Sequence, residues 1–401
     1  MPFARPELLR RELAQALPER PFTLHFWDGS KLAPTTSGGP VFTVRSPTAV
    51  AHLLRAPGQL GLGRAYVAGE LQADDLDRVI GLLNTFQAPA IDAKTRLRLT
   101  LAALRACGLT APPRVPASEL RPRGRRHSRT RDARAVRHHY DVSNDFFALF
   151  LDESMTYSCA LFSRGARTLA QAQAAKLELV CTKLALEADE RVLDVGCGWG
   201  SFVLHAARHH RVRAVGITLS PLQAELARRR VAEAGLEDRV AIRIADYREL
   251  AGERFDAIAS IGMVEHVGAS QIDVYAAQLA ALLEPGGRLL NHGIARLRHG
   301  EAEAGPFSER YVFPDAAPLH VSRILLALER AGITPEHVEG FARDYAETLS
   351  HWIERLDANR EQAELLAGAE RLRVWRLYLR AARNGFRNGF TSIFQVLGRR
   401  A

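Results

Sequence analysis

The stretch VLDVGCGWGSF, residues 192–202, carries the strongest indication of a fold in this 401-residue chain. An apolar run containing Asp194 leads into three glycines spaced G-x-G-x-G, and a helical pattern follows. Glycine lets a backbone turn tightly and approach a ligand at the carboxyl end of a buried strand, where open α/β sheets bind. A dinucleotide-binding turn has the spacing G-x-G-x-x-G and an acid about twenty residues later. The stretch therefore predicts a strand, a ligand-binding turn of a different type, and a helix.

Short apolar runs alternate with amphipathic helical patterns beyond this turn. They are VRAVGIT (212–218), RVAIRIAD (239–246), FDAIASIGM (255–263) and GGRLLNHGIA (286–295). This alternation predicts βαβ units and a parallel sheet, and hence the α/β class. Residues 300–388 are largely helical in pattern and are expected to cover a substrate, while FTSIFQVL (390–397) is expected to be the last strand.

The amino-terminal part has a different pattern. Residues 1–110 mix strand-like runs, FTLHFWDGS (22–30) and PVFTVRS (40–46), with helical patterns at 47–57 and 74–86. They predict a small auxiliary α+β domain, expected to serve lipid binding or dimerisation. Residues 111–137 are rich in Pro and Arg with little periodicity, which predicts a linker, and residues 138–401 form the main domain.

The charge is positive and carried mainly by arginine. The net charge is +9, with 54 Lys and Arg against 45 Asp and Glu, and the only lysines stand at 31, 94, 176 and 183. From Arg121 to Arg137 there are eight arginines and one aspartate. Arginine binds phosphate in a bidentate fork, which suits phospholipid headgroups or nucleic acid. The segment is either a solvated tether or an electrostatic grip on anionic lipid, worth roughly 1 kcal/mol per arginine.

The cysteines and the hydropathy of the sequence indicate the cellular location and the kind of membrane contact to expect. Cys107, Cys159, Cys181 and Cys197 form no C-x-x-C pair and have no histidine at metal-ligand spacing, so neither a metal site nor a disulfide framework is predicted. A reduced, cytoplasmic location is expected. The amino terminus lacks the apolar stretch of a signal peptide, and no window approaches about 18 uninterrupted apolar residues. Any membrane contact is therefore expected to be peripheral, at the inner face.

The glycine turn and the strands after it resemble the cofactor site of class I S-adenosylmethionine-dependent methyltransferases. In that layout the turn holds the methionine part of the cofactor, and the second strand usually ends in an acid that binds the ribose. Here it ends in Thr218 to Ser220, followed by Gln223, whose hydroxyls and amide can bind ribose hydroxyls instead. After the third strand, Tyr247 offers an aromatic face for adenine, with Arg248 next to it.

Upstream of the turn, HHYDVSNDFFALFLDESMTYSCALF (138–162) is dense in aromatic and polar residues. It resembles the signature of cyclopropane fatty acid synthases and mycolic acid cyclopropane synthases, H-Y-D-x-x-N/D-D-F/L followed by T/Q-Y-S-C-A. The resemblance spans about residues 136–398, through LDVGCGWGSF, GITLSPLQ, ADYREL, SIGMVEHVG, RYVFPDAAPLH, DYAETLSHWIERL and the terminal FQV. It implies these cofactor-binding residues: Tyr157, Ser158, Asp194, Gly196, Cys197, Gly198, Trp199, Gly200, Thr218, Leu219, Ser220, Gln223, Tyr247 and Arg248.

The resemblance also implies a specific chemistry in which an alkene attacks the sulfonium methyl group and a bound bicarbonate then removes a proton to close a ring. The implied bicarbonate-holding residues are Cys159, Glu265, His292, Ile294 and Tyr345, with Cys159 and Ile294 contributing backbone amides. A cationic intermediate needs a dry pocket with aromatic faces. Suitable side chains are those of Phe146, Phe147, Phe150, Tyr157 and Phe162. Ala382 stands where some members of the family have a cysteine, which this chemistry does not need.

The implied substrate is an unsaturated phospholipid in the membrane, and the implied cofactors are S-adenosylmethionine and bicarbonate. The oligomeric state is not predicted, and a homodimer is one alternative. Other members of the family install a methylene or methyl branch with a reductase partner, and the shared site does not separate the two outcomes. A small-molecule N- or C-methyltransferase is a second alternative, disfavoured by the complete bicarbonate set. The basic charge suggests nucleic-acid modification, but an N/D-P-P-Y/F motif and a recognisable RNA-binding module are missing from the sequence. A further alternative is a lipid-binding protein without catalytic activity. The intact glycine turn disfavours it, because such a protein would not need a cofactor site.

Overall fold

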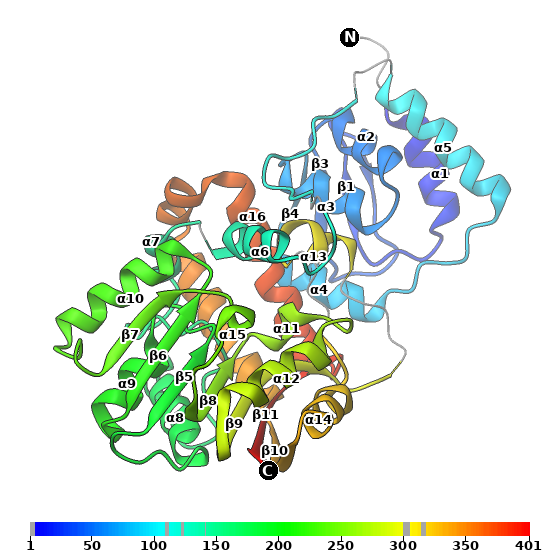
Figure 1. Ribbon diagram of the computed structural model, residues 1–401. Coiled ribbons are helices and arrows are strands. Elements are labelled where there is room, and N and C mark those ends of the chain that lie inside the picture. Colours follow the sequence, from blue (N-terminus) through cyan, green and yellow to red (C-terminus); the bar gives the residue numbers. More distant parts are fainter. Residues whose placement is uncertain (1–4, 109–111, 122–123, 141, 300–304, 314–317) are drawn as a thin grey trace. The chain divides into compact units, whose positions relative to one another are not determined.

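The computed structural model describes residues 5–108, 112–121, 124–140, 142–299, 305–313 and 318–401 (Figure 1). The chain divides into two compact units. The smaller unit comprises Met1–Leu120, Gly305–Tyr311 and Gly368–Ala381, and the larger one Arg121–Ala304, Val312–Ala367 and Ala382–Ala401.

The smaller unit is an α+β structure with a four-stranded sheet in the order β2-β1-β3-β4. β1 pairs antiparallel with β2 and parallel with β3, and β3 pairs antiparallel with β4. Its elements are α1 (Glu7–Ala16), β1 (Thr23–His25), β2 (Lys31–Leu32), β3 (Val41–Val44), α2 (Pro47–Arg55), α3 (Gln59–Val67), β4 (Leu71–Ala73), α4 (Leu76–Thr85), α5 (Ala93–Cys107) and α13 (Pro306–Tyr311). The two strand-like runs and two helical patterns predicted here form β1, β3, α2 and α4.

A buried ion pair joins distant parts of the chain within this unit. Arg64 of α3 donates from Nε and an Nη atom to the two carboxylate oxygens of Glu119, each over 2.7 Å. Tyr311 of α13 donates its hydroxyl to the same carboxylate over 3.0 Å. Such a bidentate pair is geometrically specific, because the planar guanidinium matches the carboxylate. It fixes residues 119 and 311 against α3.

The larger unit contains a seven-stranded sheet in the order β10-β11-β9-β8-β5-β6-β7. Neighbouring strands from β9 to β7 are parallel, while β11 is antiparallel to both β9 and β10. The strands are β5 (Arg191–Val195), β6 (Arg213–Thr218), β7 (Val240–Ile244), β8 (Phe255–Ile261), β9 (Leu283–Arg296), β10 (Ile333–Gly340) and β11 (Thr391–Arg400). The predicted α/β fold with a mainly parallel sheet is confirmed.

Helices cover both faces of this sheet (Figure 1). α8 (Leu169–Lys183), α9 (Ser201–His210) and α10 (Pro221–Glu233) pack on one face, and α12 (Ile272–Leu282) and α14 (Val321–Arg330) pack on the other. The larger unit also contains α6 (Arg129–Tyr140), α7 (Asn144–Ala148), the short 3₁₀ helix η1 (Tyr247–Glu249), α11 (Val264–Val267) and α15 (Ala342–Ala358), while α16 (Arg360–Arg387) is shared between the two units. Successive strand residues point to opposite faces. Val192 therefore joins the core under α8, α9 and α10, while Leu193 joins the core under α12 and α14.

The region after residue 300 contains a strand that its sequence pattern did not predict. β10 is a polar edge strand, ITPEHVEG, whose residues are mostly at least partly exposed, and its pairing with β11 is irregular between Pro335 and His337. An edge strand with one neighbour needs no alternating apolar pattern, which explains why the expectation of a largely helical region missed it. α16 is interrupted at Gly368, whose φ of 78° is outside helical geometry.

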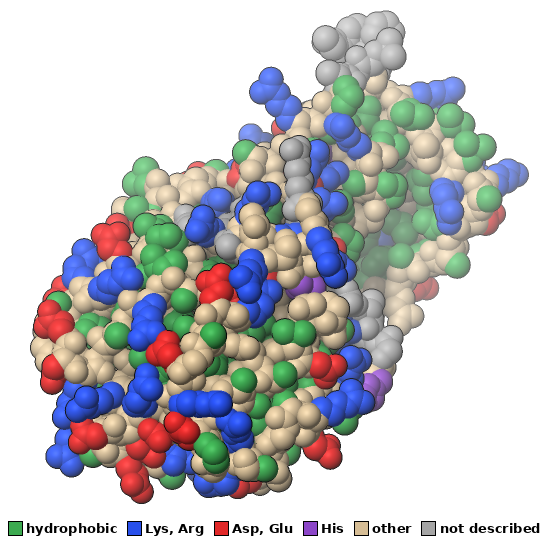
Figure 2. Space-filling model, in the orientation of Figure 1, with side chains coloured by type: hydrophobic (Ala, Val, Ile, Leu, Met, Phe, Trp, Pro, Cys, Tyr) green, Lys and Arg blue, Asp and Glu red, His purple; other side chains and the backbone are tan. Residues whose placement is uncertain are grey.

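The segment predicted as a linker is partly helical. α6 begins at Arg129, and its residues belong to the larger unit. Arg129 pairs with Glu249 at 3.2 Å, and Asp132 accepts from Arg248 at 3.0 Å. Lys and Arg side chains are spread over the visible face of the larger unit, with Asp and Glu between them (Figure 2). No helix of the described residues is both long and apolar enough to cross a membrane.

Candidate active site

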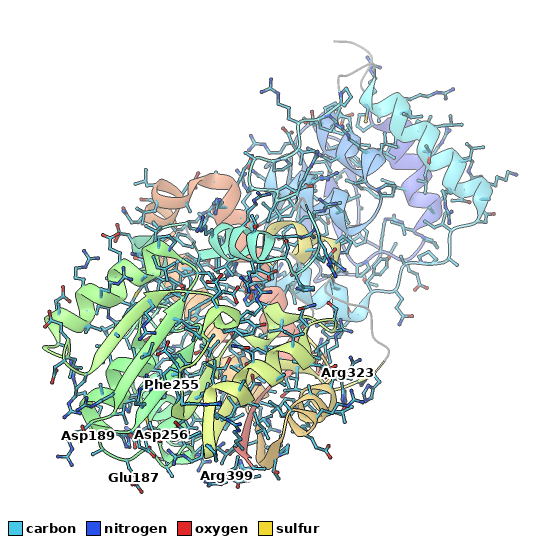
Figure 3. The ribbon with its side chains drawn as sticks, viewed as in Figure 1. Glu187, Asp189, Phe255, Asp256, Arg323 and Arg399 are labelled. Carbon is cyan, nitrogen blue, oxygen red and sulfur yellow. The ribbon has the colours of Figure 1, made fainter. Side chains whose placement is uncertain are left out.

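A cavity lies at the carboxyl edge of β5, β6, β7 and β8 in the larger unit. Its walls include the glycine turn after β5 and residues that follow the other three strands. At the opposite edge, Glu187 and Asp189 precede β5, and Asp256 stands near the start of β8 (Figure 3). Parallel strands present functional side chains where they end, so this cavity is the expected ligand site.

The glycine turn is shaped by backbone conformations that other residues rarely adopt. Gly196, Gly198 and Gly200 have φ values of 83°, 53° and 83°. The amides of Gly196 and Cys197 donate to the carbonyl of Ile217 over 3.0 and 2.9 Å, which ties the turn to β6. Gly200 then begins α9, where a Cβ would lie 3.3 Å from Ala227. The glycines of the turn therefore let its backbone approach the cavity closely, next to Cys197 and Trp199.

Two buried side chains of opposite charge line this cavity. Asp194 is 2% exposed, its Oδ1 has no hydrogen-bond partner among the described residues, and burial raises its pKa to about 7. Lys176 of α8 is also 2% exposed, and its Nζ donates to the Ser158 hydroxyl over 2.9 Å. Burial lowers the pKa of Lys176 to about 8. A ligand carrying both an ammonium and a carboxylate would match this pair.

Most of the predicted cofactor-binding residues line the cavity, but Gly200 and Ser220 do not. Gly200 starts α9, and the Ser220 hydroxyl caps α10 by accepting from the amide of Gln223 over 3.2 Å. Both residues therefore shape the turns instead of facing the cavity. The Thr218 hydroxyl donates to Oε1 of Gln223 over 2.7 Å, so these two polar groups face the cavity as a connected pair.

Tyr247 and Arg248 also line the cavity, in the turn after β7. Tyr247 packs edge-to-face on Tyr275 with ring centroids 5.5 Å apart, and burial raises its pKa to about 12. The guanidinium of Arg248 is held by Asp246, at 2.8 and 2.6 Å, and by Asp132 of α6, at 3.0 Å. Arg248 therefore acts as a structural link between the turn and α6.

Four of the five predicted bicarbonate-holding residues are buried, Ile294 is partly buried, and none of the five lines this cavity. The amide of Ile294 donates to Oε1 of Glu265 over 2.7 Å, so it positions that carboxylate. Oε2 of Glu265 and both ring nitrogens of His292 have no hydrogen-bond partner among the described residues. Burial raises the pKa of Glu265 to about 7 and lowers that of His292 well below its usual value, which keeps the imidazole neutral.

Cys159 and Tyr345 are linked to this group through Phe341. The Cys159 thiol donates to the Phe341 carbonyl over 3.8 Å, and the Phe341 ring is stacked near His292 with centroids 6.4 Å apart. Tyr345 stands one turn further along α15, with its amide donating to the carbonyl of Phe341 over 3.0 Å. Burial raises the pKa of Cys159, so its thiol is not a reactive thiolate.

Aromatic side chains lead from the cavity, which Tyr157 lines, through Trp352 to Tyr345, whose ring lies 6.0 Å from that of Trp352. Phe146, Phe147 and Phe150 are fully buried, and Phe147 contacts the rings of Tyr157 and Trp199 at 5.5 and 4.9 Å. Tyr157 also stacks on Trp352 at 5.0 Å. Phe162 instead stacks on His351 at 5.0 Å. The region is therefore apolar and aromatic, as predicted from the sequence for four of the five rings, and Trp352 was not foreseen.

Several cavity-lining residues escaped the sequence prediction. Lys176 is the most important of them, and its signal was a lysine on the otherwise apolar face of α8 that carries Leu177 and Val180. His127 and Asp132 also line the cavity, although the sequence pattern places them in the linker. His266 lines it too, and burial lowers the pKa of this histidine to about 4; the sequence pattern predicts no role for it. Asp141 and residues 314–317 belong to the sequence stretches that carry the family resemblance, but they lie outside the described residues.

Comparisons with known proteins agree with this geometry. The family model "Mycolic acid cyclopropane synthetase" matches residues 127–396. "Probable fatty acid methyltransferase Rv3720" of Mycobacterium tuberculosis is 39% identical over 96% of this chain and 92% of its own length. "Cyclopropane-fatty-acyl-phospholipid synthase" of Escherichia coli is 33% identical over 88% of this chain and 86% of its own length.

A solved structure shows the same fold at comparable identity. Mycolic acid cyclopropane synthase CmaA1, complexed with SAH and CTAB, aligns with a TM-score of 0.63 and 32% identity over 67% of this chain and 98% of that one. The matched residues include the glycine turn, the strands around it and the buried polar group. The chain therefore belongs to the mycolic acid cyclopropane synthetase family of S-adenosylmethionine-dependent methyltransferases.

Proposed function

We propose that this protein transfers a one-carbon unit from S-adenosylmethionine to the cis double bond of an unsaturated phospholipid acyl chain and closes a cyclopropane ring. The observation that carries the proposal is the set of buried polar atoms without hydrogen-bond partners among the described residues, Glu265 Oε2 and the two ring nitrogens of His292. Buried polar atoms cost free energy unless a ligand satisfies them. A small polar anion at this point would do so.

S-adenosylmethionine fits the residues of the cavity. Asp194 would accept from the ammonium of its methionine part, and Lys176 with Ser158 would donate to the carboxylate, which gives the unpartnered Asp194 Oδ1 a donor. Thr218 and Gln223 would hold the ribose hydroxyls, and Tyr247 would pack on the adenine. When bound, the cofactor supplies an electrophilic methyl group.

Bicarbonate fits the buried polar group. Glu265 and the neutral imidazole of His292 would hold it, with Tyr345 and the backbone of Cys159 nearby. When bound, it supplies a base. The role of the protein is to orient that base and to keep the Glu265 carboxylate fixed through the Ile294 amide, at 2.7 Å. Because Ile294 already donates to Glu265, we assign it a positioning role rather than direct contact with the anion.

An aromatic wall would protect a cationic intermediate. Tyr157, Phe147 and Trp352 form continuous ring contacts with centroids 5.0 to 5.5 Å apart. The faces of aromatic rings stabilise positive charge, and their bulk keeps out water that would quench it. An alkene is a weak nucleophile with no proton to remove beforehand, so the chemistry depends on this dry environment and on the base beyond it.

We further propose that α5 contacts the anionic inner face of the membrane. Leu97, Leu101 and Leu104 recur at helical spacing on one face and are 60%, 49% and 53% exposed. Exposed Lys94, Arg98 and Arg105 stand next to this face, although Arg98 also pairs with Glu12 at 3.0 Å. Leucines can enter the headgroup boundary while basic residues attract anionic lipid, at roughly 1 kcal/mol each.

A second candidate product is a methylene or methyl branch, made with a reductase partner. It is favoured by the similarity to a relative named as a probable fatty acid methyltransferase. Ring and methylene products have the same mass, so the products must be separated by proton NMR. After incubation of the purified chain with S-adenosylmethionine and dioleoyl-phosphatidylglycerol vesicles, ring protons upfield of the acyl methyl signals support the proposal. Vinylidene protons, or a methyl branch on adding a reductase fraction, would establish the alternative.

A further inference from the structure

Three potential metal ligands converge where α8 and α9 of the larger unit pack against each other (Figure 1), and a fourth side chain, Glu178, contacts two of them. Cys181 and Glu178 stand one turn apart on α8, and His205 and His210 stand on α9. The sulfur of Cys181 and one nitrogen of each histidine all lie within 4.8 Å of one another. None of the four belongs to the cofactor cavity or to the buried polar group.

The Glu178 carboxylate closes the set on its outer side. Its Oε2 lies 3.0 Å from His205 Nε2, and both its oxygens lie 3.2 Å from His210 Nε2. In a tetrahedral zinc site with metal-ligand bonds near 2.1 Å, neighbouring nitrogen and oxygen ligands are about 3.3 Å apart. The nitrogen and oxygen atoms therefore already have the spacing of a zinc site. The sulfur lies within 4.8 Å of the two nitrogens and would need to approach to about 3.6 Å, which shortens each distance by up to about 1.2 Å.

Burial and charge also suit a divalent cation. Cys181 is fully buried against apolar residues of the helical core, while the side chains of His205, His210 and Glu178 are 14%, 20% and 50% exposed. One thiolate and one carboxylate balance the charge of Zn²⁺, so the occupied site would be neutral overall. As the metal-sulfur bond forms, the thiol proton of Cys181 would be released to solvent.

We propose that Cys181, His205, His210 and Glu178 form a structural Zn²⁺ site that clamps α8 to α9. All four positions are then protein ligands, as is usual for structural zinc. α8 carries Lys176, and α9 starts at the glycine turn, so the clamp would steady two helices that border the cofactor cavity. Sequence spacing could not indicate the site, because β5 separates Cys181 from His205 along the chain and only folding brings them together.

The alternative is a hydrogen-bonded cluster in which Glu178 accepts from both histidines. That cluster does not involve the sulfur, so Cys181 separates the two possibilities. Co²⁺ is the suitable probe, since a tetrahedral site with a thiolate gives intense visible bands and a sulfur-to-metal charge-transfer band. The experiment titrates the tag-free, metal-stripped full chain with CoCl₂ and then displaces the cobalt with ZnCl₂.

We expect one equivalent of Co²⁺ with the charge-transfer band and a rise in Tm on adding ZnCl₂. Cys181→Ser should abolish the band, and His210→Ala, at the more exposed ligand, should weaken binding at least about tenfold and remove the Tm shift. His209→Ala, a neighbour of His205 at 4.5 Å, and Cys107→Ser are the matched controls and should leave both signals intact. The proposal would be overturned if the wild type does not bind Co²⁺, or binds it without the charge-transfer band. It would also be overturned if His210→Ala binds Co²⁺ as tightly as the wild type.

Discussion

Burying a carboxylate costs free energy unless a partner compensates, and both Asp194 and Glu265 keep one oxygen without a partner among the described residues. The two acids differ in their surroundings. Asp194 shares the cofactor cavity with the ammonium of Lys176, whereas Glu265 accepts a hydrogen bond from the amide of Ile294. These environments are the reason why we propose a cofactor-binding role for Asp194 and a role in orienting a base for Glu265.

Glu265→Gln tests the second role. Gln can still accept from the Ile294 amide, but its neutral side chain cannot orient an anionic base through a shared proton, so turnover should fall by about 10²-fold or more. Affinity for S-adenosylmethionine, measured by calorimetry, should remain within about twofold. His292→Gln should behave alike. Glu336→Gln, at the exposed edge strand, is the control, and loss of cofactor affinity in Glu265→Gln would refute the assignment.

The same residue makes a prediction about stability. Burial raises the pKa of Glu265 from 4.5 to about 7, so the folded state holds this proton more tightly than the unfolded state. The stability contributed by the protonated group is complete below the unfolded pKa and is lost as the pH rises through about 7. Between about pH 5 and pH 8, Glu265→Gln should therefore gain roughly 2 to 3 kcal/mol relative to the wild type in urea unfolding. If the free energies of unfolding of the two proteins change in parallel with pH, Glu265 is not buried as described.

Lys176→Met tests the role of the buried ammonium. Removing the charge should lower the affinity for S-adenosylmethionine at least about tenfold, because the carboxylate of the cofactor loses its cation. Lys183→Met is the matched control on the same helix, since Lys183 pairs with Glu339 at 2.6 Å and should affect stability alone. Equal cofactor affinity in Lys176→Met and the wild type would contradict this role.

At the level of helices and strands, sequence patterns were most successful where the elements are apolar. β5, β6, β8 and β9 are buried strands and were predicted from their apolar runs, and the glycine turn located the cavity. β10 was missed because a polar edge strand carries no alternating pattern. Residues 129–137 of α6 were predicted as part of a linker, since the contacts of this helix with residues 246–249 are polar and tertiary.

The exposed leucines of α5 lead to a prediction for this helix. Leu101→Gln combined with Leu104→Gln should weaken binding to dioleoyl-phosphatidylglycerol vesicles by about tenfold in a sedimentation assay, because two apolar side chains no longer enter the lipid boundary. Leu365→Gln is the control, since Leu365 is 80% exposed on α16, directly after Glu364 and one helical turn after Glu361. Equal vesicle binding by the double variant and the control would remove α5 as the membrane contact.

On the scale of the whole molecule, the chain is organised as two units that do not follow its linear order. Residues 305–311 and 368–381 join the amino-terminal residues, and the Arg64–Glu119–Tyr311 network shows how the first of these segments is held. Helical periodicity predicted helices beyond residue 300 but carried no information about which unit they would join. Such assignments depend on long-range polar pairs that no local pattern reveals.

The central claim, that an unsaturated acyl chain is the methyl acceptor, is tested most directly with radiolabelled S-adenosylmethionine and two kinds of vesicle. One kind contains dioleoyl-phosphatidylglycerol, and the other contains its saturated distearoyl counterpart. After hydrolysis, label is expected only in the acyl chains of the unsaturated lipid, and Glu265→Gln should abolish it. Label in headgroups, in free fatty acid added as a competitor or in soluble amines, with none in the oleoyl chains, would contradict the claim.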